Sequence, residues 1–370
     1  IIKLERDGFM YKKRSIFLAV VMGIILLFSG ISGANNVESL TLPEAVNMAI
    51  EKNIDLKIAE VTYDNAEIDY SKNKANNLMS GSRYTKIQNE YSLIQAKENF
   101  NNQRNEVITQ TVTEYMQIIQ SNLNIDIKKK QLQLEDNILQ DVKNQYKNGH
   151  KSKLEFLKQD NKKDNVVFNL EKAQNDREQL LKEFKTRLGI NLDKNISLKE
   201  FEYCKKIESS EAEAIKKGIK HSETLKLCKK KIELAKVNLN RAQTTTTPEL
   251  DLKKLKNNLK LAELKHKNNK QKLKNSIQKQ YYQYQQSFKN LDLSEKNLKE
   301  ARENYQIVKE QEKVGLKTEN DLLSAKLNVM QKKSNQIISL SEYINSMLKL
   351  KQTMGDDLRG IIDDLAEKEE

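Results

Sequence analysis

Cysteine and histidine are the side chains most able to hold a metal ion, and the sequence has two cysteines and three histidines in 370 residues. Cys204 and Cys228 form no Cys-x-x-Cys motif, and His150, His221 and His266 form no paired histidine motif. The sequence therefore predicts no metal site and no cofactor. A disulfide between the two cysteines stays open, and the alternative is that Cys228 is a small apolar residue on a helix face.

The 52 acidic residues are the other candidates for chemistry, as general acids or bases. They recur with the spacing of charges on solvated helix faces rather than in an apolar pocket, and without burial the sequence identifies no pair whose pKa values would be tuned. It also contains no glycine-rich phosphate loop and no nucleophile elbow. We therefore expect that the protein is not an enzyme.

The most specific local signals are two similar turns. Gly149 and Gly315 can take the left-handed backbone conformation that ends a helix, and Ser152 and Thr318 follow three residues later, where they can cap the next helix. An acidic residue stands three positions after each cap, Asp321 in the second turn, which is the pattern of a capping box. The sequence predicts an antiparallel helical hairpin at each turn. An ordinary helix boundary is the default interpretation, and only the repetition goes beyond it.

The elements that carry these turns are predicted to be long helices. Charged residues make up 32% of the sequence, with 11 glycines and 2 prolines, which favours extended helices over compact α/β folds or β-sandwiches. Apolar residues recur at steps of three and four, the heptad pattern of helices that pack side by side. They include Ile108, Val112, Tyr115, Ile119 and Leu123, and later Ile277, Tyr281, Tyr284, Phe288 and Leu291. A helix over 87–148 would have roughly 60 residues and a length of ~90 Å.

The sequence also repeats itself once. Glu44-Ala45-Val46 corresponds to Glu213-Ala214-Ile215 at an offset of 169 residues, whereas Gly189 corresponds to Gly355 at 166, the same offset that separates the glycines of the two turns. Two tandem halves that differ by a three-residue indel explain both offsets. The predicted organisation is upstream residues and a signal segment at 1–34, a first helical repeat at 35–200, a second at 201–360 and a charged tail at 361–370.

The N-terminal segment has the pattern of a secretory signal peptide. Lys12-Lys13-Arg14 precedes an apolar run from Ile16 to Phe28, and small residues follow at 32–34. A run of about 13 residues is short for a membrane-spanning helix, which needs about 20, so an uncleaved anchor is the alternative. We expect the true start at Met10, and no lipoprotein processing, because no cysteine follows the run.

The formal net charge is +13 at pH 7. Removal of residues 1–34 takes away five basic and two acidic residues, which leaves 60 − 50, or +10. An exported protein has no access to the chromosome, and the lysines of this sequence are interleaved with glutamates rather than collected in one segment. We therefore expect no nucleic acid partner. An anionic cell-wall or membrane surface is the contact that this charge favours, and solvated helix faces are the default alternative.

Two segments resemble the TolC family of outer-membrane efflux proteins. They are Leu40-Thr41-Leu42-Pro43-Glu44-Ala45, and the second turn with its continuation, Gly315-Leu316-Lys317-Thr318-Glu319-Asn320-Asp321-Leu322-Leu323-Ser324-Ala325. The resemblance implies a homo-trimer whose long helices form an α-helical tunnel, and a tip of helical turns that contacts an adaptor (membrane fusion) protein and an inner-membrane or ABC-type pump. By resemblance, the partner-binding residues at this tip are Gly149, Ser152, Gly315, Thr318 and Asp321.

One departure from the family pattern is large. The family places paired strands of an outer-membrane β-barrel between the first two helices of each half, but the corresponding segments here, 72–85 and 243–248, are short, rich in Asn or Thr and without alternation. We therefore expect an all-α fold of long antiparallel, coiled-coil-like hairpins. It would be a TolC-type α-barrel body in two tandem repeats, with transmembrane β-barrel strands absent.

Together these inferences predict an exported TolC-like efflux or secretion component that forms or lines a helical tunnel and works with an adaptor and a membrane pump. The family is located in the outer membrane, and the missing strands favour the extracytoplasmic face or the cell wall. One alternative is a cell-envelope coiled-coil structural protein without transport activity. Another is a membrane-surface binder that uses basic helices. Polar residues opposite the apolar stripe, such as Gln278, suit a water-filled lumen as well as bulk solvent and so do not separate a tunnel from a solvated helix.

Overall fold

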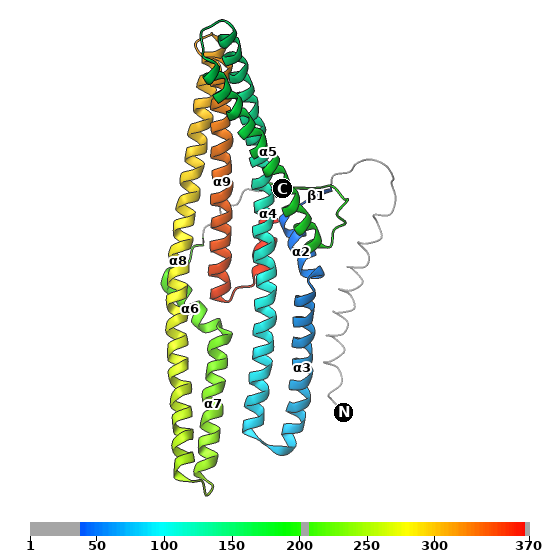
Figure 1. Ribbon diagram of the computed structural model, residues 1–370. Coiled ribbons are helices and arrows are strands. Elements are labelled where there is room, and N and C mark those ends of the chain that lie inside the picture. The colour runs from blue at the N-terminus through cyan, green and yellow to red at the C-terminus, as the bar shows by residue number, and fades with distance from the viewer. Residues whose placement is uncertain (1–37, 201–206, 367–370) are drawn as a thin grey trace. The chain divides into compact units, whose positions relative to one another are not determined.

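The computed structural model describes residues 38–200 and 207–366 (Figure 1). The predicted signal segment, Cys204 and the end of the predicted tail lie outside these residues. The helices are α2 (Leu42–Lys52), α3 (Ile54–Ser80), α4 (Arg83–Lys147), α5 (Lys153–Leu188), α6 (Glu211–His221), α7 (Glu223–Gln243), α8 (Glu249–Lys313), α9 (Glu319–Met354) and α10 (Leu358–Ala366). The described residues from Ser39 onward belong to one compact unit.

The helix lengths reproduce the predicted duplication. α4 and α8 have 65 residues each, α5 and α9 have 36 each, and α2 and α6 have 11 each. α6 begins 211 − 42, or 169, residues after α2, whereas α8 begins 249 − 83, or 166, residues after α4. The three-residue difference therefore falls within α3, α7 and the turns that follow them. α3 has 27 residues and α7 has 21.

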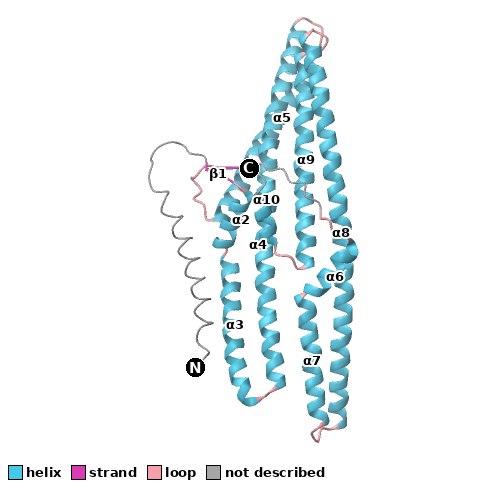
Figure 2. Ribbon diagram, turned by 180° about the vertical axis from the view of Figure 1, so that it is seen from behind, coloured by secondary structure: helices cyan, strands magenta, loops and turns pink. Residues whose placement is uncertain are grey.

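Each repeat is built on its 65-residue helix, which packs against two shorter antiparallel helices in succession along its length (Figure 1). α4 packs against α3 near its beginning and α5 near its end, and α8 packs against α7 and α9 in the same way. α4 also contacts α7 and α9, so the two repeats lie side by side. We call residues 148–152 and 314–318 the upper turns, and residues 81–82 and 244–248 the lower turns; the two pairs lie at opposite ends of the helices (Figures 1 and 2).

At both positions where the resemblance calls for paired strands, the structure has a turn between two helices. Gly81, with a φ of +63°, ends α3, and Ser82 caps α4. Residues 244–248 join α7 to α8. The predicted all-α fold of antiparallel hairpins is thus confirmed for the described part of the chain. None of the described helices is both long and apolar enough to cross a membrane.

The sequence did not predict a small sheet that the structure contains. β1 (Glu38–Leu40) and β2 (Ile196–Leu198) have three residues each and pair in a two-stranded sheet. Strands this short offer no alternating pattern to recognise. The hydroxyl of Tyr115, on α4, lies 2.9 Å from the carbonyl oxygen of Leu40 and 2.7 Å from that of Lys199. The sheet is therefore fastened to the middle of α4.

The predicted heptad stripes supply the core, which lies where α2, α4, α5, α8, α9 and α10 meet. Buried members of the two stripes are Ile108, Val112, Tyr115, Ile119, Ile277, Tyr284 and Leu291, and half-buried members are Leu123, Tyr281 and Phe288. Each stripe thus faces a neighbouring helix. The predicted helix over 87–148 corresponds to α4, whose observed bounds are Arg83–Lys147.

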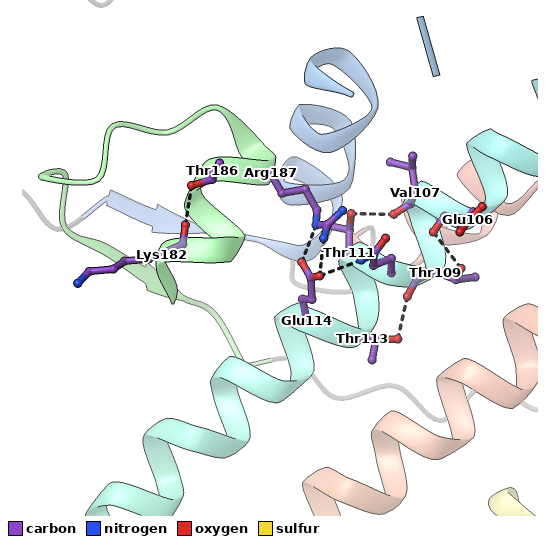
Figure 3. Close-up of polar contacts among 10 residues, drawn as sticks. Glu106, Val107, Thr109, Thr111, Thr113, Glu114, Lys182, Thr186 and Arg187 are labelled. Atoms are coloured by element: carbon purple, nitrogen blue, oxygen red, sulfur yellow. Dashed lines mark hydrogen bonds and ion pairs between the residues drawn. The ribbon is translucent and has the colours of Figure 1, made fainter. Parts of the chain in front are cut away.

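A polar contact fastens α5 to α4 in the first repeat (Figure 3). Arg187 donates from Nε and Nη2 to the two carboxylate oxygens of Glu114, both at 2.8 Å. This two-pronged geometry is the strongest form of an arginine–carboxylate ion pair. The positions 166 residues further on are Gln280 and Thr353, which cannot form an ion pair. The repeats therefore share their helices but not this polar contact.

Candidate partner-binding turns

The upper turns end α4 and α8 with the same backbone geometry. Gly149 and Gly315 have φ angles of +75° and +76°, in the left-handed region that a residue with a side chain rarely adopts. In the first turn the N–H of His150 donates to the carbonyl of Gln145 at 2.8 Å, and the equivalent bond from Leu316 in the second is 2.9 Å. These bonds belong to a Schellman motif, which satisfies the last carbonyl groups of each helix.

The helices that follow the upper turns begin with the predicted capping boxes. The Ser152 hydroxyl accepts a hydrogen bond from the Glu155 N–H at 3.2 Å, and the Glu155 carboxylate accepts one from the Ser152 N–H at 2.8 Å. Thr318 and Asp321 form the same pair of bonds at 3.1 Å and 2.9 Å. Each box satisfies two backbone donors that the first turn of a helix leaves free. The chain direction after each turn is therefore fixed locally.

Both capping carboxylates are held in their charged form. Two hydrogen bonds lower the pKa of Glu155; the bond from the Ser152 backbone has the larger effect, and the bond from the Ser152 side chain has the smaller one. The backbone and then the side chain of Thr318 lower the pKa of Asp321 in the same way. A negative charge at the start of a helix also interacts favourably with the helix dipole.

Contacts between the repeats bring the two upper turns together. The side-chain amide of Asn137, on α4, donates to Asn320 Oδ1 at 3.1 Å. Asn320, in the first turn of α9, in turn donates to the Asp141 carboxylate at 3.5 Å. Gly149, Ser152, Gly315, Thr318 and Asp321 therefore lie on two neighbouring turns at one end of the helices (Figure 1).

The glycines of the upper turns are needed for their backbone conformation and not for close packing. A Cβ built on Gly149 or Gly315 would meet no atom within 4 Å. Both glycines are exposed, as are Ser152 and Thr318. The turns thus present backbone groups and a narrow profile that a partner protein can approach closely.

The structure adds side chains at the upper turns that the motifs did not identify. The rings of Tyr146 and Phe156 stack with centroids 5.7 Å apart and brace the first turn. Val314 and Leu316 are exposed in the second turn. A shallow depression beside it is lined by Gln306, Ile307, Glu310, Gln311 and Val314. Ile307 and Val314 are seven residues apart, a heptad spacing of apolar residues that was available in the sequence.

The described residues give the turns no metal or redox chemistry. Within 38–200 and 207–366, no three His, Cys, Asp or Glu side chains are grouped so that they could hold a metal ion. Cys228 is a free, half-buried thiol on α7, and its sulfur accepts a hydrogen bond from Asn269 at 3.2 Å. The upper turns are instead characterised by exposed backbone and by the exposed apolar side chains of Val314 and Leu316.

No protein-family model and no curated protein matches the sequence. Solved structures do match. The outer membrane protein VceC of Vibrio cholerae matches with a TM-score of 0.61 at 12% identity, over 85% of this chain and 96% of that chain. The outer-membrane channel OprN matches with a TM-score of 0.62 at 11% identity, over 86% of this chain and 90% of its own. The outer membrane channel CmeC of Campylobacter jejuni matches with a TM-score of 0.59 at 15% identity, over 87% of this chain and 88% of that chain. This chain therefore has the fold of these outer-membrane proteins, two of which are named as channels, and the predicted TolC-type helical body is confirmed at the level of the fold.

Proposed function

We propose that the protein is an exported TolC-like efflux or secretion component whose helices form or line a tunnel, and that it works with an adaptor and a membrane pump in the cell envelope. The observation that carries this proposal is the likeness to VceC, OprN and CmeC over 85%, 86% and 87% of this chain. OprN and CmeC are named as channels, which argues against a catalytic role.

A tunnel needs several copies of the chain, and α3 supports self-association. Ile54, Ile58, Val61 and Ile68 on this helix are spaced by four, three and seven residues, and each is between 59% and 72% exposed. This is a heptad seam that no other helix of the described residues covers. We assign it to contact with another copy, and the TolC resemblance implies a homo-trimer.

The upper turns are the proposed site for the adaptor. This proposal is supported by two matching turns that lie side by side and are both exposed. A Schellman motif and a capping box fix the conformation of each turn. A rigid tip costs little conformational entropy when a partner binds it. Gly149, Ser152, Gly315, Thr318 and Asp321 hold its shape in this proposal.

Deletion of the gene tests the transport role. Loss of an efflux component should raise the accumulation of a fluorescent efflux dye in whole cells, and the wild-type gene should restore export. Ile58→Glu with Val61→Glu should fail to restore it and should sediment as a monomer, because two charges interrupt the α3 seam. An envelope defect with unchanged dye accumulation would instead support the coiled-coil structural protein.

A further inference from the structure

The lower turns carry the most exposed large apolar side chains of the described residues. Leu78 and Met79, at the end of α3, are 82% and 94% exposed, and Leu250, at the start of α8, is 80% exposed. Tyr84, in the first turn of α4, is 41% exposed. Apolar groups left in water at this density mark an interaction surface.

The same end of the molecule has a strong surplus of positive charge. Residues 72–89 contain four basic and no acidic residues, and residues 234–262 contain six basic and two acidic ones, for a net charge of 4 + 4, or +8. Segments of equal length at the upper turns, 141–158 and 302–330, contain ten basic and seven acidic residues, for a net charge of +3. Glu90, Glu233 and Glu263 lie at the borders of the lower segments, and with one more residue at each end the net charges are 3 + 2, or +5, at the lower turns and +3 at the upper turns. The lower end is therefore the more basic of the two.

These basic side chains are available to a partner. All ten are exposed, and among the described residues none of them forms an ion pair. They are Lys72, Lys74, Arg83, Lys86, Lys236, Arg241, Lys253, Lys254, Lys256 and Lys260. Other surface lysines do form ion pairs. The Nζ of Lys162, for example, lies 2.9 Å from Oε1 of Glu135.

We propose that the lower turns bind the surface of a membrane that contains anionic phospholipids. Leu78, Met79 and Leu250 would enter the boundary between headgroups and acyl chains, with Tyr84 at headgroup level, while the basic side chains contact lipid phosphates. Both lower turns lie at one end of the helices, so one flat surface can contact both (Figures 1 and 2). Exposed apolar groups, together with basic residues that form no ion pair within the described part of the chain, fit this surface better than a protein partner, which would have to supply acids over a wide area. The inference does not rest on the transport proposal.

Sedimentation with lipid vesicles tests it on residues 35–370, which retain the described compact unit and omit the apolar signal run that would itself bind lipid. The protein should bind vesicles of phosphatidylcholine with 30% phosphatidylglycerol, and much less to pure phosphatidylcholine. Binding should weaken as salt rises from 0.05 to 0.5 M, because the Debye length falls from about 14 Å to about 4 Å.

Two sets of variants separate the apolar and ionic contributions. Leu78→Gln, Met79→Gln and Leu250→Gln together should weaken binding about tenfold or more. Val314→Gln with Leu316→Gln is the matched control at the upper turns, where both side chains are similarly exposed, and it should leave binding unchanged. Lys72→Gln, Lys74→Gln, Arg83→Gln and Lys86→Gln together should reduce the preference for anionic vesicles without changing the melting temperature.

Three outcomes would overturn the inference. Equal binding to neutral and anionic vesicles would remove the role of charge, and equal loss in the lower and upper apolar variants would remove the role of the lower turns. Absence of binding to either vesicle would assign the surface to a protein partner instead. Circular dichroism of each variant verifies that the helices are intact, so that a loss of binding is not a loss of fold.

Discussion

The two upper turns match each other, whereas the two lower turns do not. Both upper turns have five residues, a glycine with positive φ and a capping box. Of the lower turns, one has two residues and a Ser82 cap, and the other has five residues and ends at Pro248, which makes no side-chain cap. Since both repeats have the same long helices, this difference indicates that backbone geometry matters at the upper end. The lower end is distinguished by its apolar and basic side chains instead.

The largest effect is expected from a core variant that tests whether the two ends belong to one cooperative unit. Phe184, on α5, is fully buried in the core and packs edge-on against Tyr115 with ring centroids 6.4 Å apart. Phe184→Ala should lower the free energy of unfolding by about 3–5 kcal/mol, from lost burial and the cavity left behind. Hydrogen-exchange protection should fall at the upper and lower ends together.

Phe168→Ala is the matched control, because Phe168 lies on the same helix and is 63% exposed. Its effect on the free energy of unfolding should stay within about 0.5 kcal/mol. Loss of protection at the upper hairpins alone in Phe184→Ala would show that the ends unfold separately, and the comparison would then concern two units rather than two ends of one.

A second pair of variants compares one glycine from each end. Gly315 and Gly81 both have positive φ and no atom within 4 Å of an added Cβ, so valine at either position should cost about 1–2 kcal/mol of stability through backbone strain alone. Adaptor pull-down, corrected for the folded fraction, should fall for Gly315→Val and stay normal for Gly81→Val. Normal binding by both would contradict the assignment of the upper turns as the partner site.

A smaller effect is expected from the caps. Thr318→Ala removes the hydroxyl and its two bonds, one to the Asp321 N–H and one to the Asp321 carboxylate, and keeps the bond from the backbone N–H of residue 318. It should cost about 1 kcal/mol, whereas Ser82→Ala removes a simple cap and should cost about 0.5 kcal/mol. Urea unfolding monitored by circular dichroism measures both. An equal or larger loss in Ser82→Ala would remove the distinction between tightly capped upper turns and loosely capped lower ones.

The smallest effect is a pH dependence confined to the upper turns. The pKa values of Glu155 and Asp321 are lowered in the folded protein, so their contribution to stability is present above the unfolded value of about 4 and is lost as pH falls through the folded values. Hydrogen-exchange protection of the upper turns should therefore decrease below about pH 4. Glu155→Gln should remove this decrease from the first upper turn, and an unchanged profile in that variant would show that other acids cause it.

The sequence by itself determined the helices, their turns and their duplication, because each depends on residues close together in the chain. A heptad stripe fixes the buried face of a helix, and a glycine followed by a cap fixes where one helix ends and the next begins. For that reason α4 was predicted within four residues at its beginning and one at its end, and Gly149 and Gly315 both occupy the turns assigned to them.

The tertiary structure alone decided which distant segments meet. β1 pairs with β2, Asn137 bonds to Asn320 across 183 residues, and the basic and apolar residues of the two lower turns gather at one end. None of these follows from local periodicity, because a helix pattern says which face is apolar but not which helix will cover it. The packing of α4 against α7 and α9 makes that choice, and it places the two upper turns together at one end and the two lower turns together at the other.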